Sequence, residues 1–233
     1  MRTRSSFTLI ELIIVLIILG ILAFSLNFNF FNNNLEVAAD KLIRDIRFTQ
    51  SLALKDDKYY PFPDNNTSYE YNKSKYWFKQ WWQIKFIKSH GDYFYQIFSD
   101  SPDFDLSGGP VSEYALNPLN EKYIAGAYSS STNAISEYNL SKYNIKLIDP
   151  YKDPYDRRQA LRLVFDNLGN VFLEEGQSGD AGDINPLYKN KRHLLVHTLK
   201  IHLCLDNPCI LTKDRCIQVN ITPTGYAYKS TCN

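Results

Sequence analysis

The hydrophobic positions of the chain begin with one long apolar run near its N-terminus. Residues 7–26 (FTLIELIIVLIILGILAFSL) are apolar except for Thr8, Glu11, Gly20 and Ser25. As a helix with a rise of about 1.5 Å per residue, this run spans about 30 Å, which is the thickness of the hydrocarbon core of a bilayer. The pattern therefore predicts a membrane-spanning helix over residues 7–26.

A second helical pattern follows the asparagine-rich stretch 27–34. Its apolar residues recur at the spacing of one helix face, whereas charged residues such as Lys41 and Asp45 occupy the remaining faces. We expect one helix over residues 7–57, with a length of roughly 70 Å as far as Lys55, whose second half packs on a globular head. Two helices separated by a break at the asparagines are the alternative. The expected apolar face consists of Leu35, Ala38, Ala39, Leu42, Ile46, Thr49, Leu52 and Ala53.

The remaining residues, 58–233, alternate between polar and apolar or aromatic positions in several short segments. Such alternation is typical of strands with one buried face. We therefore expect an α+β fold in which the long N-terminal helix, transmembrane in its first half, packs on a mainly antiparallel β-sheet head. Stretches 59–75 and 104–144 have the composition of loops. The expected strands cover 76–88, 93–99, 161–165, 170–173, 199–205 and 217–221.

The charges before the apolar run predict its orientation. Residues 1–6 (MRTRSS) contain Arg2 and Arg4 and no acid, and such cations are enriched on the cytoplasmic side of membrane helices. We therefore expect a single-pass protein with a cytoplasmic N-terminus and an extracytoplasmic head. An ordinary cleaved secretory signal is disfavoured because its apolar region is usually shorter than this run.

The four cysteines of the chain all lie within the last 30 residues. Residues 223–225 (PTG) predict a three-residue hairpin loop, which pairs residues whose numbers sum to 448, as those of Cys216 and Cys232 do. Because an extracytoplasmic compartment is oxidising, disulfides are favoured over zinc. Of the three pairings that four cysteines allow, we favour Cys216 with Cys232 and Cys204 with Cys209.

Glu11 places a carboxylate inside the apolar run. An unpaired acid in a membrane-spanning helix costs about 3 kcal/mol, so it requires a cationic partner. Cleavage between Ser6 and Phe7 would create an amino group four residues before Glu11, and in staggered neighbouring copies that amine can neutralise the carboxylate. Glu11 is therefore a candidate assembly residue.

The segment Ser6-Phe7-Thr8-Leu9-Ile10-Glu11, followed by the apolar run, resembles the class III signal of type IV pilins and of the pseudopilins of type II secretion. The resemblance implies that residues 1–6 are a leader peptide and that prepilin peptidase cuts between Ser6 and Phe7 and methylates the new N-terminus. The family has Gly before the cut, where this chain has Ser6. The resemblance also implies an inner-membrane location, a periplasmic head and assembly into a periplasmic or surface filament.

Three segments of the C-terminal half, 161–166, 169–171 and 221–226, resemble the head of the GspH/FimT group of minor pseudopilins and minor pilins. The implied function is that of a minor pseudopilin, a structural subunit of the periplasmic pseudopilus of a type II secretion system. The implied partners are other pilin-like subunits, prepilin peptidase, the inner-membrane assembly platform and membrane lipid. The alternative is a minor pilin of a type IV pilus or of a DNA-uptake machine that contacts DNA.

Charge and composition argue against DNA binding and against enzymatic activity. The chain has 26 Lys+Arg and 25 Asp+Glu, and loss of Arg2 and Arg4 with the leader changes its formal net charge from +1 to −1. Binding to DNA phosphates requires an excess of cations, but residues 226–233 contain only Lys229, so nucleic acid is the less favoured partner. The sequence contains no catalytic motif, and we expect no cofactor, no metal site and no enzymatic activity.

The pattern Asp/Glu-x-Asn-x-Ser/Thr occurs three times, around Asn66, Asn72 and Asn139. It resembles the acceptor site of bacterial N-linked oligosaccharyltransferases, and extracytoplasmic loops suit that modification. These asparagines are therefore candidate glycosylation sites. An unmodified loop in an asparagine-rich chain is an equally good explanation.

Overall fold

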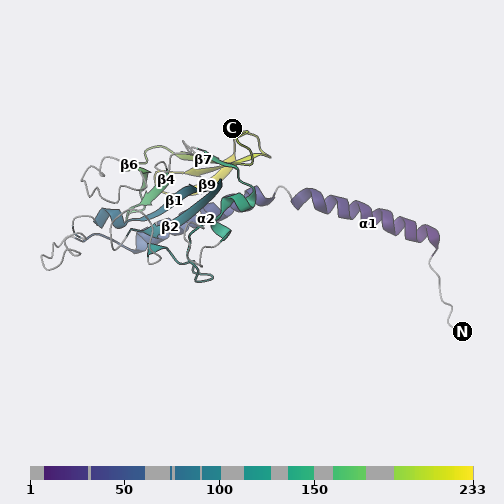
Figure 1. The fold of residues 1–233 in the computed structure, drawn as a ribbon, viewed down its shortest axis with the longest axis horizontal. Helices are drawn as coiled ribbons and strands as arrows, with labels where there is room; N and C mark the ends of the chain where they lie inside the picture. The colour runs from purple at the N-terminus through teal and green to yellow at the C-terminus, as the bar shows by residue number, and fades with distance from the viewer. Residues whose placement is uncertain are drawn as a thin grey trace.

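The structure of the 233-residue chain is a computed structural model. It describes residues 8–30, 33–60, 74, 77–89, 91–100, 113–126, 136–149, 160–176 and 192–232. Two helices come first, α1 (Leu9–Phe30) and α2 (Asn33–Lys55). Figure 1 shows α1 projecting away from the strands, whereas α2 lies among them. Residues 31 and 32, where the expected single helix would continue or break, lie outside the described residues.

The described strands form two antiparallel sheets. A five-stranded sheet has the order β2-β1-β4-β5-β6, and a four-stranded sheet has the order β3-β7-β8-β9. All the pairings are antiparallel, so the prediction of an N-terminal helix followed by a mainly antiparallel head is confirmed. The strands are β1 (Trp82–Ser89), β2 (Asp92–Ser99), β3 (Leu147–Asp149), β4 (Ala160–Phe165), β5 (Val171–Gly176), β6 (Arg192–Leu194), β7 (Leu199–Cys204), β8 (Cys216–Ile221) and β9 (Ala227–Thr231).

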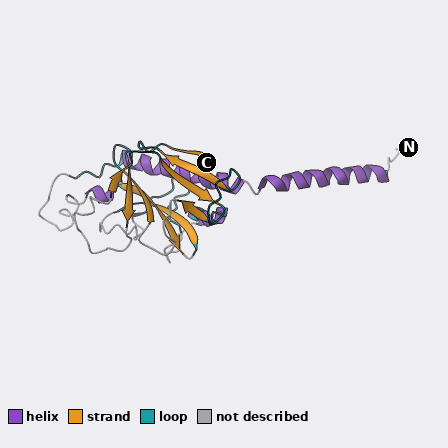
Figure 2. Ribbon diagram, turned by 90° about the horizontal axis from the view of Figure 1, so that it is seen from above, coloured by secondary structure: helices purple, strands orange, loops and turns teal. Residues whose placement is uncertain are grey.

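Helix α2 supplies one wall of the hydrophobic core and contacts strands of both sheets (Figure 2). Its buried apolar residues recur every three or four positions because only that spacing keeps them on one face. They pack with the inward residues of β1, β2, β7 and β8 in one continuous cluster. The buried apolar residues of α2 are Leu35, Ala38, Ala39, Leu42, Ile43, Ile46 and Ala53.

The first expected strand, 76–88, is wrong at its N-terminal end. Residues Trp77–Gln80 form a short 3-10 helix, η1, and the strand begins at Trp82. The reason is the length of the partner strand. Trp82 pairs with Ser99, the last residue of β2, so earlier residues have no β2 backbone to pair with. The Ser99 hydroxyl instead donates to the Gln80 carbonyl at 2.6 Å.

The expectation of one buried face is also wrong for β8, all six of whose residues are buried. Its polar side chains are satisfied by one another and by neighbouring strands. Gln218 Nε2 donates to Asn220 Oδ1 at 2.5 Å, and Asn220 Nδ2 donates to Ser230 Oγ at 2.9 Å. Gln218 Oε1 lies 3.1 Å from His202 Nε2. A polar row therefore crosses the outer face of β7, β8 and β9.

Part of the expected loop 104–144 pairs with the edge of β2. Residues 113–126 run beside that strand, and the backbone N–H of Ala115 donates to the Ile97 carbonyl at 2.9 Å. The N–H of Ile97 donates in turn to the Ile124 carbonyl at 2.9 Å. Two further short helices follow, η3 (Ser136–Tyr138) and η4 (Leu140–Tyr143). Residues 113–126 thereby supply hydrogen-bond partners to the backbone of β2, which would otherwise be an open sheet edge.

Two hairpin turns, β4–β5 and β8–β9, meet at the side chain of Gln50 on α2. Gln50 Nε2 donates to the Gly169 carbonyl at 3.1 Å and to the Thr224 carbonyl at 2.6 Å. Gly225 has a φ of +79°, as the expected hairpin loop requires, and a Cβ there would lie 2.3 Å from Gln50 Nε2. The close approach of Gln50 therefore depends on glycine at this position.

We expect Gly225→Ala to destabilise the head by about 2 kcal/mol, because the left-handed conformation costs an alanine about 1 kcal/mol and displaced hydrogen bonds cost about 1 kcal/mol more. Gly91→Ala is the matched control, since Gly91 has a φ of +90° but open space around its Cβ position. Urea unfolding of both variants measures the difference. Equal losses would show that Gln50 contributes nothing to holding the turns.

Candidate assembly site

The first turn of α1 carries the only acid of that helix. The backbone N–H groups of Glu11 and Leu12 both donate to the Thr8 carbonyl, at 3.1 and 3.3 Å. The Glu11 side chain is exposed, and a carboxylate in the first turn interacts favourably with the helix dipole. Ser6 and Phe7, the predicted processing residues, lie outside the described residues.

The surface around Glu11 is apolar and exposed. From Leu9 to Leu22, the large hydrophobic side chains of α1 are each 45–78% exposed, so this helix contributes nothing comparable to the buried face of α2. No helix within the described ranges is both long and apolar enough to cross a membrane. The predicted span over residues 7–26, which includes Phe7, stays a prediction.

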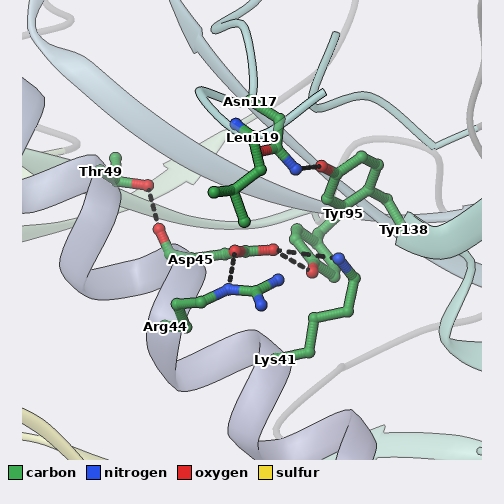
Figure 3. Close-up of polar contacts among 8 residues, drawn as sticks. All are labelled: Lys41, Arg44, Asp45, Thr49, Tyr95, Asn117, Leu119 and Tyr138. Carbon is green, nitrogen blue, oxygen red and sulfur yellow. Dashed lines mark hydrogen bonds and ion pairs between the residues drawn. The ribbon is translucent and has the colours of Figure 1, made fainter. Parts of the chain in front are cut away.

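On α2, the structure buries two charged residues that the sequence pattern places outside the apolar face (Figure 3). Asp45 is 4% exposed and Lys41 9% exposed, and Lys41 Nζ lies 3.6 Å from Asp45 Oδ2. The Tyr95 hydroxyl on β2 donates to the same carboxylate oxygen at 2.6 Å. Lys41 Nζ also lies 4.1 Å from the centre of the Tyr138 ring, and Asn117 Nδ2 donates to the Tyr138 hydroxyl at 3.0 Å. We call these five residues the Asp45 cluster.

Burial shifts the pKa values of Tyr95 and Lys41 in the Asp45 cluster. Removal from water raises the pKa of Tyr95 well above its usual 10.0, and the negative charge of Asp45 raises it further. Burial lowers the pKa of Lys41 from 10.5, although the neighbouring Asp45 opposes that shift. The Tyr95 phenol therefore stays a donor at neutral pH, and Asp45 is the acceptor that fixes α2 against β2.

The Asp45 cluster was missed in the sequence because its members are distant along the chain. The i, i+4 spacing of Lys41 and Asp45 is visible, but on a helix such a pair is usually a solvent-exposed one. Tyr95 and Asn117 come from separate segments that only the fold brings together. The cluster offers no nucleophile with an adjacent base. Its contacts hold α2 against β2 and are those of a structural element.

The four cysteines form two adjacent disulfides, Cys204–Cys209 and Cys216–Cys232, with Cα–Cα distances of 5.4 and 5.9 Å. These are the favoured pairs, and the expected register, with Ile217 opposite Thr231, is the one between β8 and β9. Across the described residues, the one close group of potential metal ligands is formed by three of these sulfur atoms. All of them are bonded to sulfur, so none is a thiolate available to a metal.

Of the candidate glycosylation sites, Asn66 and Asn72 lie outside the described residues, whereas Asn139 is described. Asn139 Oδ1 accepts from the Ser141 backbone N–H at 2.9 Å and caps the short helix η4. Its Nδ2 donates to Asp92 Oδ2 at 3.1 Å, and Ser141 Oγ accepts from the Tyr93 N–H at 2.9 Å. A glycan on Asn139 Nδ2 would have to displace the contact with Asp92, so glycosylation at this residue stays a prediction.

Lys229, the one cation in the C-terminal strand, is paired with two acids of α2. Its Nζ lies 2.6 Å from Glu36 Oε2 and 2.8 Å from Asp40 Oδ1. Hydrogen bonds to the Asp40 and Glu36 carboxylates raise the pKa of Lys229 above 10.5. The contact fixes the middle of β9 beside the first turns of α2.

Comparison with known proteins adds one match. Residues 1–26 match the family model described as the prokaryotic N-terminal methylation motif. No curated protein and no solved structure matches the chain. Proteins with this motif are structural subunits that prepilin peptidase processes and that assemble with other pilin subunits. The motif, together with an N-terminal helix and antiparallel sheets, supports a type IV pilin-like protein whose precursor is anchored in a membrane.

Proposed function

We propose that the chain is a minor pseudopilin, a structural subunit of the periplasmic pseudopilus of a type II secretion system. The observation that carries this proposal is the methylation motif over residues 1–26, in which Glu11 stands among the exposed apolar side chains from Leu9 to Leu22. A helix with this surface is suited to lipid before assembly and to the apolar helices of neighbouring subunits afterwards.

In this proposal the leader, residues 1–6, is removed before Phe7 and the new amine is methylated. The inner-membrane assembly platform then transfers the subunit from the lipid into the filament. The amine and the Glu11 carboxylate of neighbouring subunits pair, so that neither charge remains unpaired in an apolar environment. The head stays periplasmic and contacts other minor subunits or cargo.

A DNA-uptake role is less well supported. It requires cations free to neutralise phosphates, whereas Lys229 is held between Glu36 and Asp40. A gel-shift assay of the processed protein over a range of salt concentrations separates the two roles. Salt-sensitive DNA binding would favour the minor pilin of an uptake machine.

We expect Glu11→Ala to lower incorporation into filaments by roughly 10-fold to 100-fold, because a charge-assisted pair contributes about 1.5–3 kcal/mol. Glu121→Ala, which removes an exposed acid of the head, is the control and should assemble normally. Sheared filament fractions from cells that express each variant give the ratio. Normal recovery of the Glu11 variant would contradict the assembly role.

Mass spectrometry of the same fractions tests the processing step. The expected mature chain begins at a methylated Phe7 and lacks the six residues of the leader. A mature chain that still begins at Met1, with no association between copies, would overturn the proposed function.

A further inference from the structure

The loop between β7 and β8, residues 205–215, is braced at its base. The Cys204–Cys209 disulfide closes it against the last residue of β7. The Arg215 guanidinium, at the other end of the loop, donates from Nε to Asp206 Oδ2 at 2.7 Å. A loop that is already fixed in this way loses little conformational entropy when it meets a partner.

The tip of this loop presents two adjacent aliphatic side chains. Ile210 is 48% exposed and Leu211 is 47% exposed. Pro208, also exposed, lies just before them, and the exposed cation Lys213 follows. Exposed aliphatic residues on a rigid protrusion, with a cation beside them, have the composition of a surface that meets an apolar layer with an anionic rim.

The direction of β9 shows which end of the head carries this loop. The Arg47 guanidinium, near the middle of α2, donates to the carbonyl of Ala227 at the start of β9. Two residues further along β9, Lys229 contacts Glu36 and Asp40 near the start of α2. Strand β9 therefore runs toward the N-terminal end of α2.

The braced loop lies at or beyond that end. Cys232 follows Lys229 by three residues, about 10 Å of extended chain, whereas Asn33 precedes Glu36 by about 5 Å of helix. The Cys216–Cys232 disulfide therefore places the base of the loop about level with the start of α2. Helix α1 leaves the head from the same end, where Figure 1 also shows the C-terminus.

We propose that the braced loop rests on the membrane that holds α1, with Ile210 and Leu211 inserted among the lipid headgroups. The inference rests on the membrane anchoring in the proposed function. The predicted span ends at Leu26, seven residues or about 10 Å of helix before α2 begins at Asn33, so any part of the head that extends beyond the start of α2 approaches the lipid headgroups. The loop makes the anchored subunit touch the membrane twice, through its helix and through this tip.

Two exposed lysines lie at this end of the head. Lys213 and Lys146 are exposed, and Lys146 lies at the same end because its backbone N–H donates to the Cys204 carbonyl at 2.8 Å. Among the neighbouring acids, Asp206 pairs with Arg215, Glu36 and Asp40 share Lys229, and Asp214, next to Lys213, is exposed. Lys213 and Lys146 can contact lipid phosphates, but these four acids balance the four nearby cations, so the aliphatic tip and not the net charge carries the inference.

The test uses the full chain reconstituted in phosphatidylethanolamine–phosphatidylglycerol vesicles with brominated acyl chains, which quench nearby tryptophans. Ile210→Trp is compared with Leu168→Trp. Leu168 is 75% exposed and lies in the β4–β5 turn beside Gln50 and Leu54, toward the other end of α2. The three native tryptophans also lie toward that other end, because the Trp82 indole donates to Asp56 at 2.9 Å and the Trp77 ring packs against Tyr59 and Trp81. The background quenching is therefore low.

We expect the bromolipid to quench the added fluorescence of Ile210→Trp at least threefold more strongly than that of Leu168→Trp. Leu211→Trp gives an independent reading, and peptide mapping of both disulfides verifies folding. Equal quenching in protein that floats with the vesicles would overturn this inference and leave the proposed function intact. Protein that fails to float would overturn both. The purified chain is used alone, so that no other subunit covers Ile210 in place of lipid.

Discussion

Asp45→Ala is expected to lower the free energy of unfolding by about 3 kcal/mol. The substitution removes the acceptor of the Tyr95 hydroxyl, which donates at 2.6 Å, and leaves Lys41 buried without its carboxylate at 3.6 Å. Breaking a buried ion pair from one side typically costs about 3–5 kcal/mol. We expect the lower end because burial already lowers the pKa of Lys41, so the amine can lose its proton instead of remaining charged.

The matched control is Asp40→Ala, five residues earlier on α2. Asp40 is an exposed acid that pairs with Lys229, and such pairs contribute about 1 kcal/mol or less. Urea unfolding of the full chain in detergent micelles, followed by tryptophan fluorescence, measures both variants. If the two substitutions had equal effects, the Asp45 cluster would not be the tie between α2 and β2.

Replacing Cys216 and Cys232 together by alanine is expected to cost about 3 kcal/mol. That disulfide joins residues 16 apart, whereas Cys204–Cys209 joins residues 5 apart. A cross-link restricts the unfolded chain more when it closes a longer loop. Replacing Cys204 and Cys209 together by alanine should therefore cost less, about 2 kcal/mol. The longer bridge also holds the last strand, β9, to β8.

The Cys216/Cys232 and Cys204/Cys209 double variants are each compared with the unmodified protein in oxidising and in reducing buffer. In a reducing buffer the three proteins should approach the same urea midpoint, since the bridges are then absent from all of them. A larger loss for the Cys204–Cys209 pair would indicate that native packing around the braced loop, rather than restriction of the unfolded chain, determines the effect.

Features fixed by short-range patterns were predictable. The helical spacing of Leu35 through Ala53 predicts the buried face of α2, and Gly225 predicts a turn whose register places Cys216 opposite Cys232. In each case the deciding information lies within one helix or one hairpin. The alternation of apolar and polar residues likewise predicts most of the strands.

Features that depend on distant partners were not predictable. Lys41 and Asp45 look like surface residues of a helix until Tyr95 and Tyr138 cover them. Gln218 looks like the outward residue of a half-buried strand, yet it is buried on the far face of β8. A polar residue carries no local sign of whether another segment will cover it, because that depends on contacts made elsewhere in the chain.

The pairing of Lys229 with the first turns of α2 has a practical consequence for labelling. It draws the end of β9 to the side of the head from which α1 departs. A fluorescent protein or affinity tag fused to the C-terminus would therefore sit beside the anchor, where it obstructs close neighbours. A small dye attached at Leu168, which is 75% exposed and lies in the turn beside Leu54 near the other end of α2, would avoid this obstruction.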